Sequence, residues 1–173
     1  MPEDFEVTFQ YFFGYNVDQV RNLIADWAVK GYDYLWAIDS DISFPPNTLI
    51  NLLSHDCDIV SAVYRQRIPG NKIVELFRSN LQGGVSNIDW AELEGRGLVE
   101  VDACGFGCVL IKTEVLSAVG YPQFCYHSAL NHEFTISEDI DFCKKAKEKG
   151  YKIYADTRIL CDHTGSIIFG MNQ

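Results

Sequence analysis

The sequence has few basic residues and no long apolar run. It contains 14 Lys and Arg against 24 Asp and Glu, a formal net charge of -10. Because no basic cluster offsets this charge, we expect no binding to nucleic acid or to an anionic membrane surface. The apolar stretches have the length of strands and are interrupted by charges, so we expect no membrane span. The acidic start MPEDFE lacks the features of a secretory signal, and together these absences predict a cytoplasmic protein.

The six cysteines include no C-x-x-C pair. With 173 residues, 47% of them hydrophobic, the chain is large enough for one domain over residues 1–173 whose core needs no disulfides. We therefore expect reduced, mostly buried thiols. The alternative is a zinc site built around Cys104 and Cys108 with His127 or His163, a spacing that matches zinc motifs only loosely.

Strand and helix signals alternate along the first half of the chain, which is typical of an α/β fold with a mixed, mostly parallel central sheet flanked by helices. Strands are predicted by apolar, aromatic and β-branched runs, and helices by apolar residues at helical spacing. The predicted elements are strands over 5–13, 34–38 and 58–64, a helix from an Asn16 N-cap to a left-handed Gly31, and a short helix over 49–53.

The second half begins with a Gly- and Pro-containing region, 65–96, which predicts loops and hairpins that face a substrate. Regular elements then return. They are two strand-like pieces on either side of Gly105-Phe106-Gly107, helices over 112–119 and 136–150, the latter with Ser137 as its N-cap and Gly150 at its end, and a strand over 151–157.

Two aspartates, Asp39 and Asp41, directly follow the apolar run at 34–38. In extended chain, residues two apart point to one side, so the two carboxylates converge and repel each other. Mg²⁺ or Mn²⁺ resolves this repulsion, since both prefer oxygen ligands, and the carboxyl end of an α/β strand is where such folds bind ligands. The alternative is a local turn in which one aspartate caps the backbone ahead of Pro45.

Four motifs occur in one order: YLWAIDSDISFPPNTLINLL, VDACGFGCVLIKTEVL, SEDIDFCKKAKEKGYKIYADT and His163. Over roughly residues 5–165 the chain thereby resembles the GT-A fold glycosyltransferases, the nucleotide-diphospho-sugar transferases. The resemblance implies one GT-A-like domain that lacks the family's usual first strand, so that the base-binding edge is truncated, absent or supplied by another chain. It also implies metal-dependent transfer of a sugar from a nucleotide-sugar donor to a hydroxyl acceptor on a glycan, a protein or a small molecule. An oligomer of this chain is compatible with the resemblance.

The resemblance assigns a metal site to Asp39, Asp41 and His163. Asp39 and Asp41 match the D-x-D motif that holds a divalent ion against the donor diphosphate, with Asp41 in direct contact and Asp39 facing ribose or the metal through water. His163 matches a C-terminal histidine that completes this site. The expected cofactor is Mn²⁺ or Mg²⁺, and an imidazole ligand shifts the preference towards Mn²⁺.

The same resemblance gives Glu138 and Asp139 the place of the acidic pair that supplies the general base, with Asp139 as the base itself. Negative charge in the first turn of a helix is also favoured by the macrodipole regardless of function. The remaining implied site residues are Arg21, Asn22 and Arg65 near the nucleotide, and Asp102, Gly105, Phe106 and Gly107 beside the acceptor and the donor sugar.

Plain structural alternatives stay open for several of these residues. Arg21 and Asn22 fit a solvated helix face, and Arg65, like the neighbouring Arg67, fits an ordinary loop charge. Two other functions also compete. A sugar-phosphate nucleotidyltransferase needs a Gly- and Lys-rich phosphate loop that the sequence lacks. The second competing possibility is that the chain is a non-catalytic nucleotide- or sugar-binding relative, or a fragment.

Overall fold

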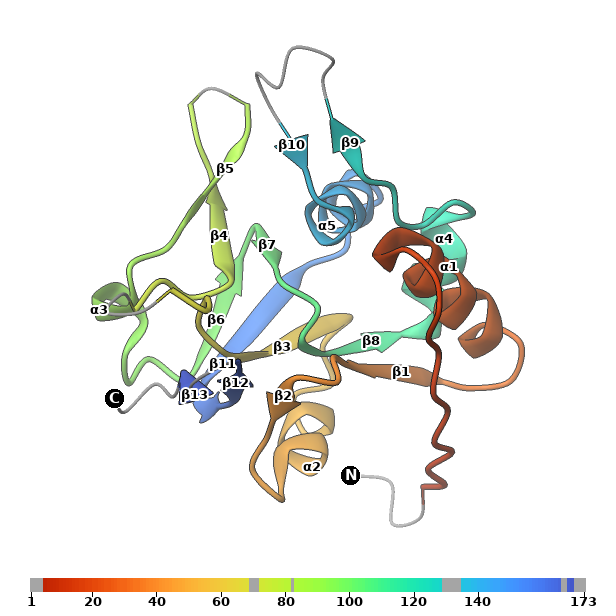
Figure 1. Cartoon of the computed structure of the whole chain (residues 1–173), viewed down its shortest axis with the longest axis horizontal. Coiled ribbons are helices and arrows are strands. Elements are labelled where there is room, and N and C mark those ends of the chain that lie inside the picture. The colour runs from red at the N-terminus through yellow and green to blue at the C-terminus, as the bar shows by residue number, and fades with distance from the viewer. Residues whose placement is uncertain (1–4, 69–71, 82, 129–134, 166–167, 170–173) are drawn as a thin grey trace.

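The computed structural model describes residues 5–68, 72–81, 83–128, 135–165 and 168–169. Its centre is a five-stranded sheet in which β3 and β11 pair in parallel and the other three pairings are antiparallel (Figure 1). The strands, in order across the sheet, are β1 (Tyr34–Ile38), β8 (Cys108–Lys112), β3 (Ile59–Val63), β11 (Ile153–Leu160) and β6 (Leu98–Val101).

The mixed sheet is confirmed, but its prediction as mostly parallel is wrong. Strand β8 lies between β1 and β3 and runs against both. Strands β1, β3 and β11 therefore point in one direction although only β3 and β11 are neighbours. Their carboxyl ends share one edge of the sheet, where the chain continues into the residues of the candidate site.

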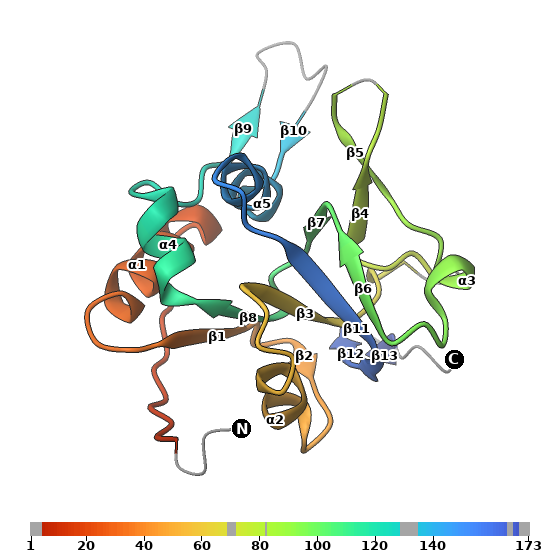
Figure 2. The same cartoon turned by 180° about the vertical axis from the view of Figure 1, so that it is seen from behind.

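Helices cover both faces of the sheet (Figure 2). The larger core packs α1 (Val17–Ala28), α4 (Thr113–Val119) and α5 (Glu138–Glu148) against one face, and the smaller core packs α2 (Thr48–Leu53) against the other. All five residues of β3 are buried, as expected of a strand covered on both sides, whereas the edge strand β1 alternates between buried and half-buried residues.

Smaller sheets complete the fold. The hairpin predicted within 65–96 is present as β4 and β5, which rise above the central sheet in Figure 1. The remaining elements are β2 (Ile42–Ser43), β4 (Leu76–Ser79), β5 (Val85–Asn87), α3 (Trp90–Leu93), β7 (Ala103–Cys104), β9 (His127–Ser128), β10 (Thr135–Ile136), β12 (Asp162–Thr164) and β13 (Ile168–Phe169).

The strand predicted over 5–13 is wrong. This segment has no regular secondary structure, and its alternate apolar side chains from Phe5 to Phe13 are exposed. The aromatic and β-branched composition favoured a strand, but no described strand pairs with the segment, and an unpaired strand has no hydrogen-bonding partner.

The predicted helix ends are partly wrong. Asn16 and Ser137 occupy N-cap positions without a side-chain bond to the helix backbone. Helix α1 ends at Ala28, and Gly31 does not adopt a positive φ, whereas Gly150 does, at 91°. In the described part of the chain, no helix combines the length and apolar character needed to cross a membrane.

The side chain of Asp156 connects β11 to the segment that follows α2. Its side chain is 2% exposed and accepts hydrogen bonds from His55 Nε2 at 2.7 Å and from Arg158 Nη2 at 2.8 Å. Burial alone would raise the pKa of Asp156, but the bonds from Arg158 and His55 outweigh it and lower this pKa to about 2. A cavity of about 350 Å³ lies beside this network, between α2 and β11.

Candidate functional site

The Asp39-Ser40-Asp41 segment is a turn between β1 and β2, not a continuation of the extended strand. Asp39 N donates to the carbonyl of Gly107 at 3.0 Å, and Ile42 N donates to the carbonyl of Asp39 at 3.1 Å. The two aspartates consequently have different partners. Asp39 forms an ion pair with Arg21, whereas Asp41 faces Arg67 and His163.

The pairing of β2 with β12 brings His163 to Asp41. Ile42 lies opposite His163, and Thr164 N donates to the carbonyl of Asp41 at 2.7 Å. His163 Nε2 then stands 3.4 Å from Asp41 Oδ2. The structure thus brings together two of the three predicted metal ligands from opposite ends of the sequence.

The histidine is held in a defined orientation. Its Nδ1 lies 2.9 Å from the carbonyl oxygen of Arg65, and since a carbonyl can only accept, Nδ1 carries the hydrogen. When the ring is neutral, Nε2 therefore carries the lone pair and directs it towards the carboxylate of Asp41. Two acceptors at this distance require a proton or a cation, and cis ligands of an octahedral ion with bonds of about 2.1 Å stand about 3 Å apart. This donor pair fits a divalent metal.

Arg67 already provides one cation at this point, because its Nη1 lies 3.0 Å from Asp41 Oδ2. The Arg67 side chain is half exposed and comes from the loop after β3, so an arriving ion can displace it at small cost. Edge-to-face packing against the buried Tyr64, at 5.5 Å between ring centroids, keeps the imidazole of His163 in place.

Arg21 is the buried counter-charge of the site. It is 7% exposed, its Nη2 lies 2.8 Å from Asp39 Oδ1, and its Nε lies 3.8 Å from Glu138 Oε1. The guanidinium also lies 5.5 Å from the ring centroid of Phe106. The reading of Arg21 as part of a solvated helix face is wrong, because α1 turns it inward between two carboxylates.

Burial raises the pKa of both carboxyl groups that Arg21 contacts. For Asp39, Arg21 opposes the shift and Asp41 and Asp139 add to it, and for Glu138, Asp139 is the next contributor after burial. Asp139 lies at the start of α5, where Ile140 N, at 2.8 Å, and Ser137 Oγ both donate to its Oδ1. Among the described residues no hydrogen bond reaches Oδ2, which is therefore the oxygen available to a substrate.

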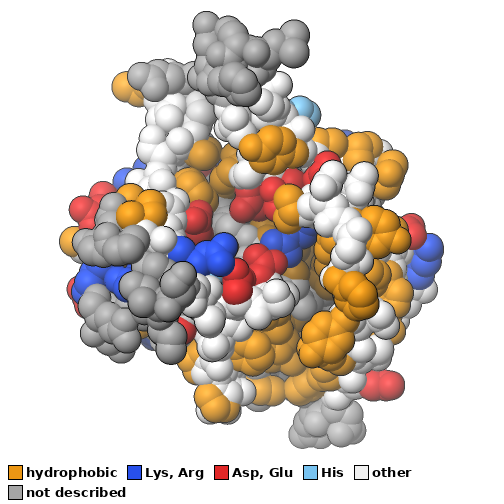
Figure 3. Space-filling model, viewed as in Figure 1, with side chains coloured by type: hydrophobic (Ala, Val, Ile, Leu, Met, Phe, Trp, Pro, Cys, Tyr) orange, Lys and Arg blue, Asp and Glu red, His pale blue; other side chains and the backbone are white. Residues whose placement is uncertain are grey.

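Glu75 also belongs to the site, although no sequence pattern pointed to it. Burial raises its pKa, the charge of Asp139 raises it further, and Gln66 and His163 lower it. It precedes β4 in a region expected to form loops. We call Asp39, Asp41, Glu75, Glu138 and Asp139 the acidic cluster. Figure 3 shows acidic and basic side chains gathered near the middle of this face of the molecule.

The Gly105-Phe106-Gly107 turn contacts the backbone of two members of the acidic cluster, Asp39 and Glu75. A Cβ on Gly105 would lie 2.2 Å from Tyr64 Oη, and one on Gly107 would lie 2.6 Å from Tyr64 Cζ. Gly107 N donates to Tyr64 Oη at 2.9 Å. Phe106 is 1% exposed and packs against Phe124 and Phe142, so its side chain belongs to the core. The glycines are required by the packing of Tyr64.

Three other predicted site residues have structural partners. The Asn22 amide bonds the backbone of Phe124 in both directions, at 2.7 and 3.1 Å, and the Asp102 carboxylate accepts from Lys147 and from Ser79 N. Arg65 is 6% exposed and contributes its carbonyl to the orientation of His163. The structure does not bring the side chains of Asn22 and Asp102 into the acidic cluster.

Four of the six cysteines are buried, which confirms the expectation of mostly buried side chains, and all six are free. The alternative zinc site is wrong, because in the described part of the chain neither Cys104 nor Cys108 belongs to a group of metal-ligating side chains with His127 or His163. One group of three metal-ligating side chains in the described part of the chain has its ligand atoms within 4.8 Å of one another. It consists of Cys125, His127 and Asp141; Asp39, Asp41 and His163 do not meet this criterion because Asp39 turns to Arg21.

No protein-family model matches the sequence. Among solved structures, the chain is similar to A197 from STIV, with 20% identity and a TM-score of 0.63 over 91% of this chain and 73% of that one. It is also similar to GalNAc-T7, solved with UDP, GalNAc and Mn²⁺, with 14% identity and a TM-score of 0.57. This match covers 85% of this chain and 30% of GalNAc-T7. At these identities the likeness is one of fold, and the fold is GT-A-like.

Proposed function

We propose that this chain is a metal-dependent glycosyltransferase that moves a sugar from a nucleotide-diphosphate donor to a hydroxyl acceptor. The observation that carries the proposal is the pairing of Asp41 Oδ2 with His163 Nε2, 3.4 Å apart, at the edge of a GT-A-like sheet. The similar fold of GalNAc-T7, which was crystallised with UDP and Mn²⁺, supports the choice of ligand.

Asp41 and His163 would hold Mn²⁺ or Mg²⁺ in this function. The bound ion supplies Lewis-acid stabilisation of the charge that builds up on the departing nucleoside diphosphate. Arg67 contacts the same Asp41 oxygen as His163, and its half-exposed side chain would move from the carboxylate to a phosphate oxygen, where a guanidinium forms bidentate bonds. Asp39 would stay paired with Arg21.

Asp139 would accept the proton of the acceptor hydroxyl as that oxygen attacks the anomeric carbon. Its Oδ1 is fixed by Ile140 N and Ser137 Oγ, which leaves Oδ2 to face a substrate. Glu138 is less suited to this role because it is 7% exposed and directed at Arg21. Its charge, with that of Arg21, keeps the start of α5 next to Asp39.

The test separates metal binding from proton transfer. Donor turnover with Mn²⁺ is measured by release of nucleoside diphosphate, and Mn²⁺-dependent binding of UDP is measured by calorimetry. Asp139→Asn should lower turnover about 10²- to 10⁴-fold while UDP binding is retained. Asp41→Asn and His163→Ala should each weaken Mn²⁺-dependent UDP binding by about ten-fold or more.

Asp162→Asn is the matched control, because Asp162 neighbours His163 in β12 but its side chain is exposed. It should leave both readouts unchanged. Unchanged turnover in Asp41→Asn refutes the metal assignment. Mn²⁺-dependent binding without transfer to any acceptor favours a non-catalytic binding relative, and a sugar nucleotide as the product favours a nucleotidyltransferase.

A further inference from the structure

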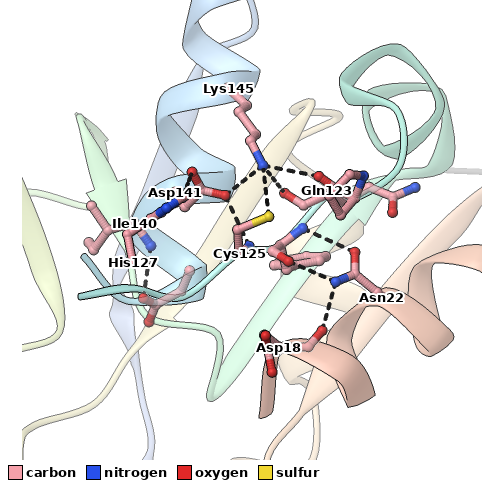
Figure 4. A network of polar contacts seen from close by, with 11 residues as sticks. Asp18, Asn22, Gln123, Cys125, His127, Ile140, Asp141 and Lys145 are labelled. Carbon is pink, nitrogen blue, oxygen red and sulfur yellow. Dashed lines mark hydrogen bonds and ion pairs between the residues drawn. The ribbon is translucent and has the colours of Figure 1, made fainter. Parts of the chain in front are cut away.

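A second group of metal-ligating side chains lies outside the acidic cluster, between the segment after α4 and the first turn of α5. Cys125 and His127 are two residues apart, and Asp141 faces them from the helix (Figure 4). The three ligand atoms, a sulfur, an imidazole nitrogen and a carboxylate oxygen, all lie within 4.8 Å of one another. None of the three has a part in the proposed sugar transfer.

The backbone that carries this group is fixed before any ion arrives. Cys125 N donates to Asp141 Oδ2 at 3.0 Å, and His127 Nε2 lies 3.0 Å from Asp141 Oδ1. On the other side, the Asn22 amide holds the preceding residue, Phe124, to α1 through two hydrogen bonds. Such preorganisation lowers the entropy that binding costs.

The donor set selects the class of metal. Sulfur and imidazole favour Zn²⁺ over the hard ions Mg²⁺ and Mn²⁺, and a tetrahedral zinc site with bonds of about 2.0–2.3 Å places its ligand atoms about 3.3–3.6 Å apart. Asp141 is buried, Cys125 is half-buried and the His127 side chain is half exposed. The open side at His127 leaves the fourth position to solvent.

Lys145 is the competing cation in this group. Its Nζ lies 2.6 Å from Asp141 Oδ2 and 3.6 Å from Cys125 Sγ, as Figure 4 shows. It contacts Oδ2, whereas His127 faces Oδ1, so the position between the imidazole and the carboxylate is not the one that the ammonium takes. The ammonium also lies close enough to the Cys125 sulfur to donate to it.

We propose that Cys125, His127 and Asp141 bind Zn²⁺, with solvent as the fourth ligand and Lys145 donating to the bound carboxylate and thiolate. The ion takes the place of the hydrogen between His127 Nε2 and Asp141 Oδ1. The imidazole then carries its single proton on Nδ1 instead of Nε2, and the Cys125 thiol releases its proton to solvent. The site would tie the Phe124–His127 segment to α5.

Titration of the reduced chain with CoCl₂ or ZnCl₂ alone tests the proposal. Co²⁺ should produce thiolate-to-metal charge-transfer absorption that Zn²⁺ abolishes by competition. This absorption should be absent in Cys125→Ser and present in Cys57→Ser, a control at another half-buried cysteine. His127→Ala, at a half-exposed side chain, should weaken Zn²⁺ binding by about ten-fold or more.

Two further variants separate this site from its rivals. Asp41→Asn should leave the charge-transfer absorption unchanged, because the proposed Mn²⁺ site contains no cysteine, and Lys145→Gln should retain or strengthen Zn²⁺ binding. Absence of the absorption in the unmodified chain, or its persistence in Cys125→Ser, would overturn the proposal and leave the four side chains as an ionic contact only. Loss of Zn²⁺ binding in Asp41→Asn would overturn it as well.

Discussion

Removal of the Arg21 charge is the perturbation that most directly probes the electrostatics of the site. Arg21 is 7% exposed and lies between Asp39 and Glu138. Breaking a buried ion pair from one side costs about 3–5 kcal/mol, because the partner charge stays buried without compensation. Since the Asp39 side chain is 41% exposed, we expect Arg21→Met to lower the free energy of unfolding by about 3 kcal/mol at pH 7.

The pH dependence of this loss distinguishes electrostatics from packing. Burial already raises the pKa of Asp39 and of Glu138, and without Arg21 both pKa values rise further. A carboxyl group whose pKa is higher in the folded state binds protons on folding, so stability falls as pH rises from the unfolded pKa through the folded one. The loss caused by Arg21→Met should therefore be smaller at pH 5 than at pH 7.

Urea unfolding at the two pH values, followed by fluorescence, measures both quantities. Lys30→Met is the matched control, because the exposed Lys30 in the turn after α1 pairs with the exposed Asp26 of the same helix, and this pair should contribute less than about 0.5 kcal/mol. Arg21→Lys should show an intermediate loss. A loss in Arg21→Met equal to that of the control, or a loss independent of pH, would show that Arg21 does not compensate the charges of Asp39 and Glu138.

Two further predictions concern packing and pH. Gly105→Ala and Gly107→Ala should each lower the free energy of unfolding by about 1–3 kcal/mol. Tyr64→Phe should partly rescue only the first, because the Gly105 Cβ would meet the Tyr64 hydroxyl whereas the Gly107 Cβ would meet the ring carbon. Equal rescue in a double-mutant cycle would contradict this account. The pKa of Asp156 is lowered to about 2 in the folded protein, so ionised Asp156 stabilises the fold above pH 4, and this stabilisation is lost as pH falls through 2. We expect it to amount to about 1–2 kcal/mol, a figure reduced for solvent screening because the Arg158 side chain is 63% exposed. Asp156→Asn should abolish this dependence in acid unfolding, and a variant that retains it would show that other groups cause it.

Buried strands and amphipathic helices could be predicted from local patterns. The apolar runs gave β1 and β3 and helical spacing gave α1, because burial on one or both faces dictates these patterns. Cap and charge signals at its two ends gave α5. Strand direction could not be read in this way, since β8 has the same apolar character whether it runs with or against its neighbours. The segment 5–13 failed for the related reason that pairing is a non-local property.

The candidate site divides along the same line. The resemblance predicted that the Asp39–Asp41 segment, the start of α5 and His163 would meet, and the structure brings them together, while their chemical roles remain predictions. The burial of Arg21 and the inclusion of Glu75 could not be predicted, because a charged side chain is buried only where the fold supplies partners.

The proposal that Asp41 and His163 bind a divalent metal is tested best by the position of Mn²⁺ in crystals grown with MnCl₂ and UDP. The anomalous signal of manganese distinguishes the ion from water and from Mg²⁺. We expect a manganese peak within about 2.3 Å of both Asp41 Oδ2 and His163 Nε2, with oxygens of the diphosphate as further ligands of the ion. A peak bound elsewhere, or UDP bound with no manganese between these two side chains, would contradict it.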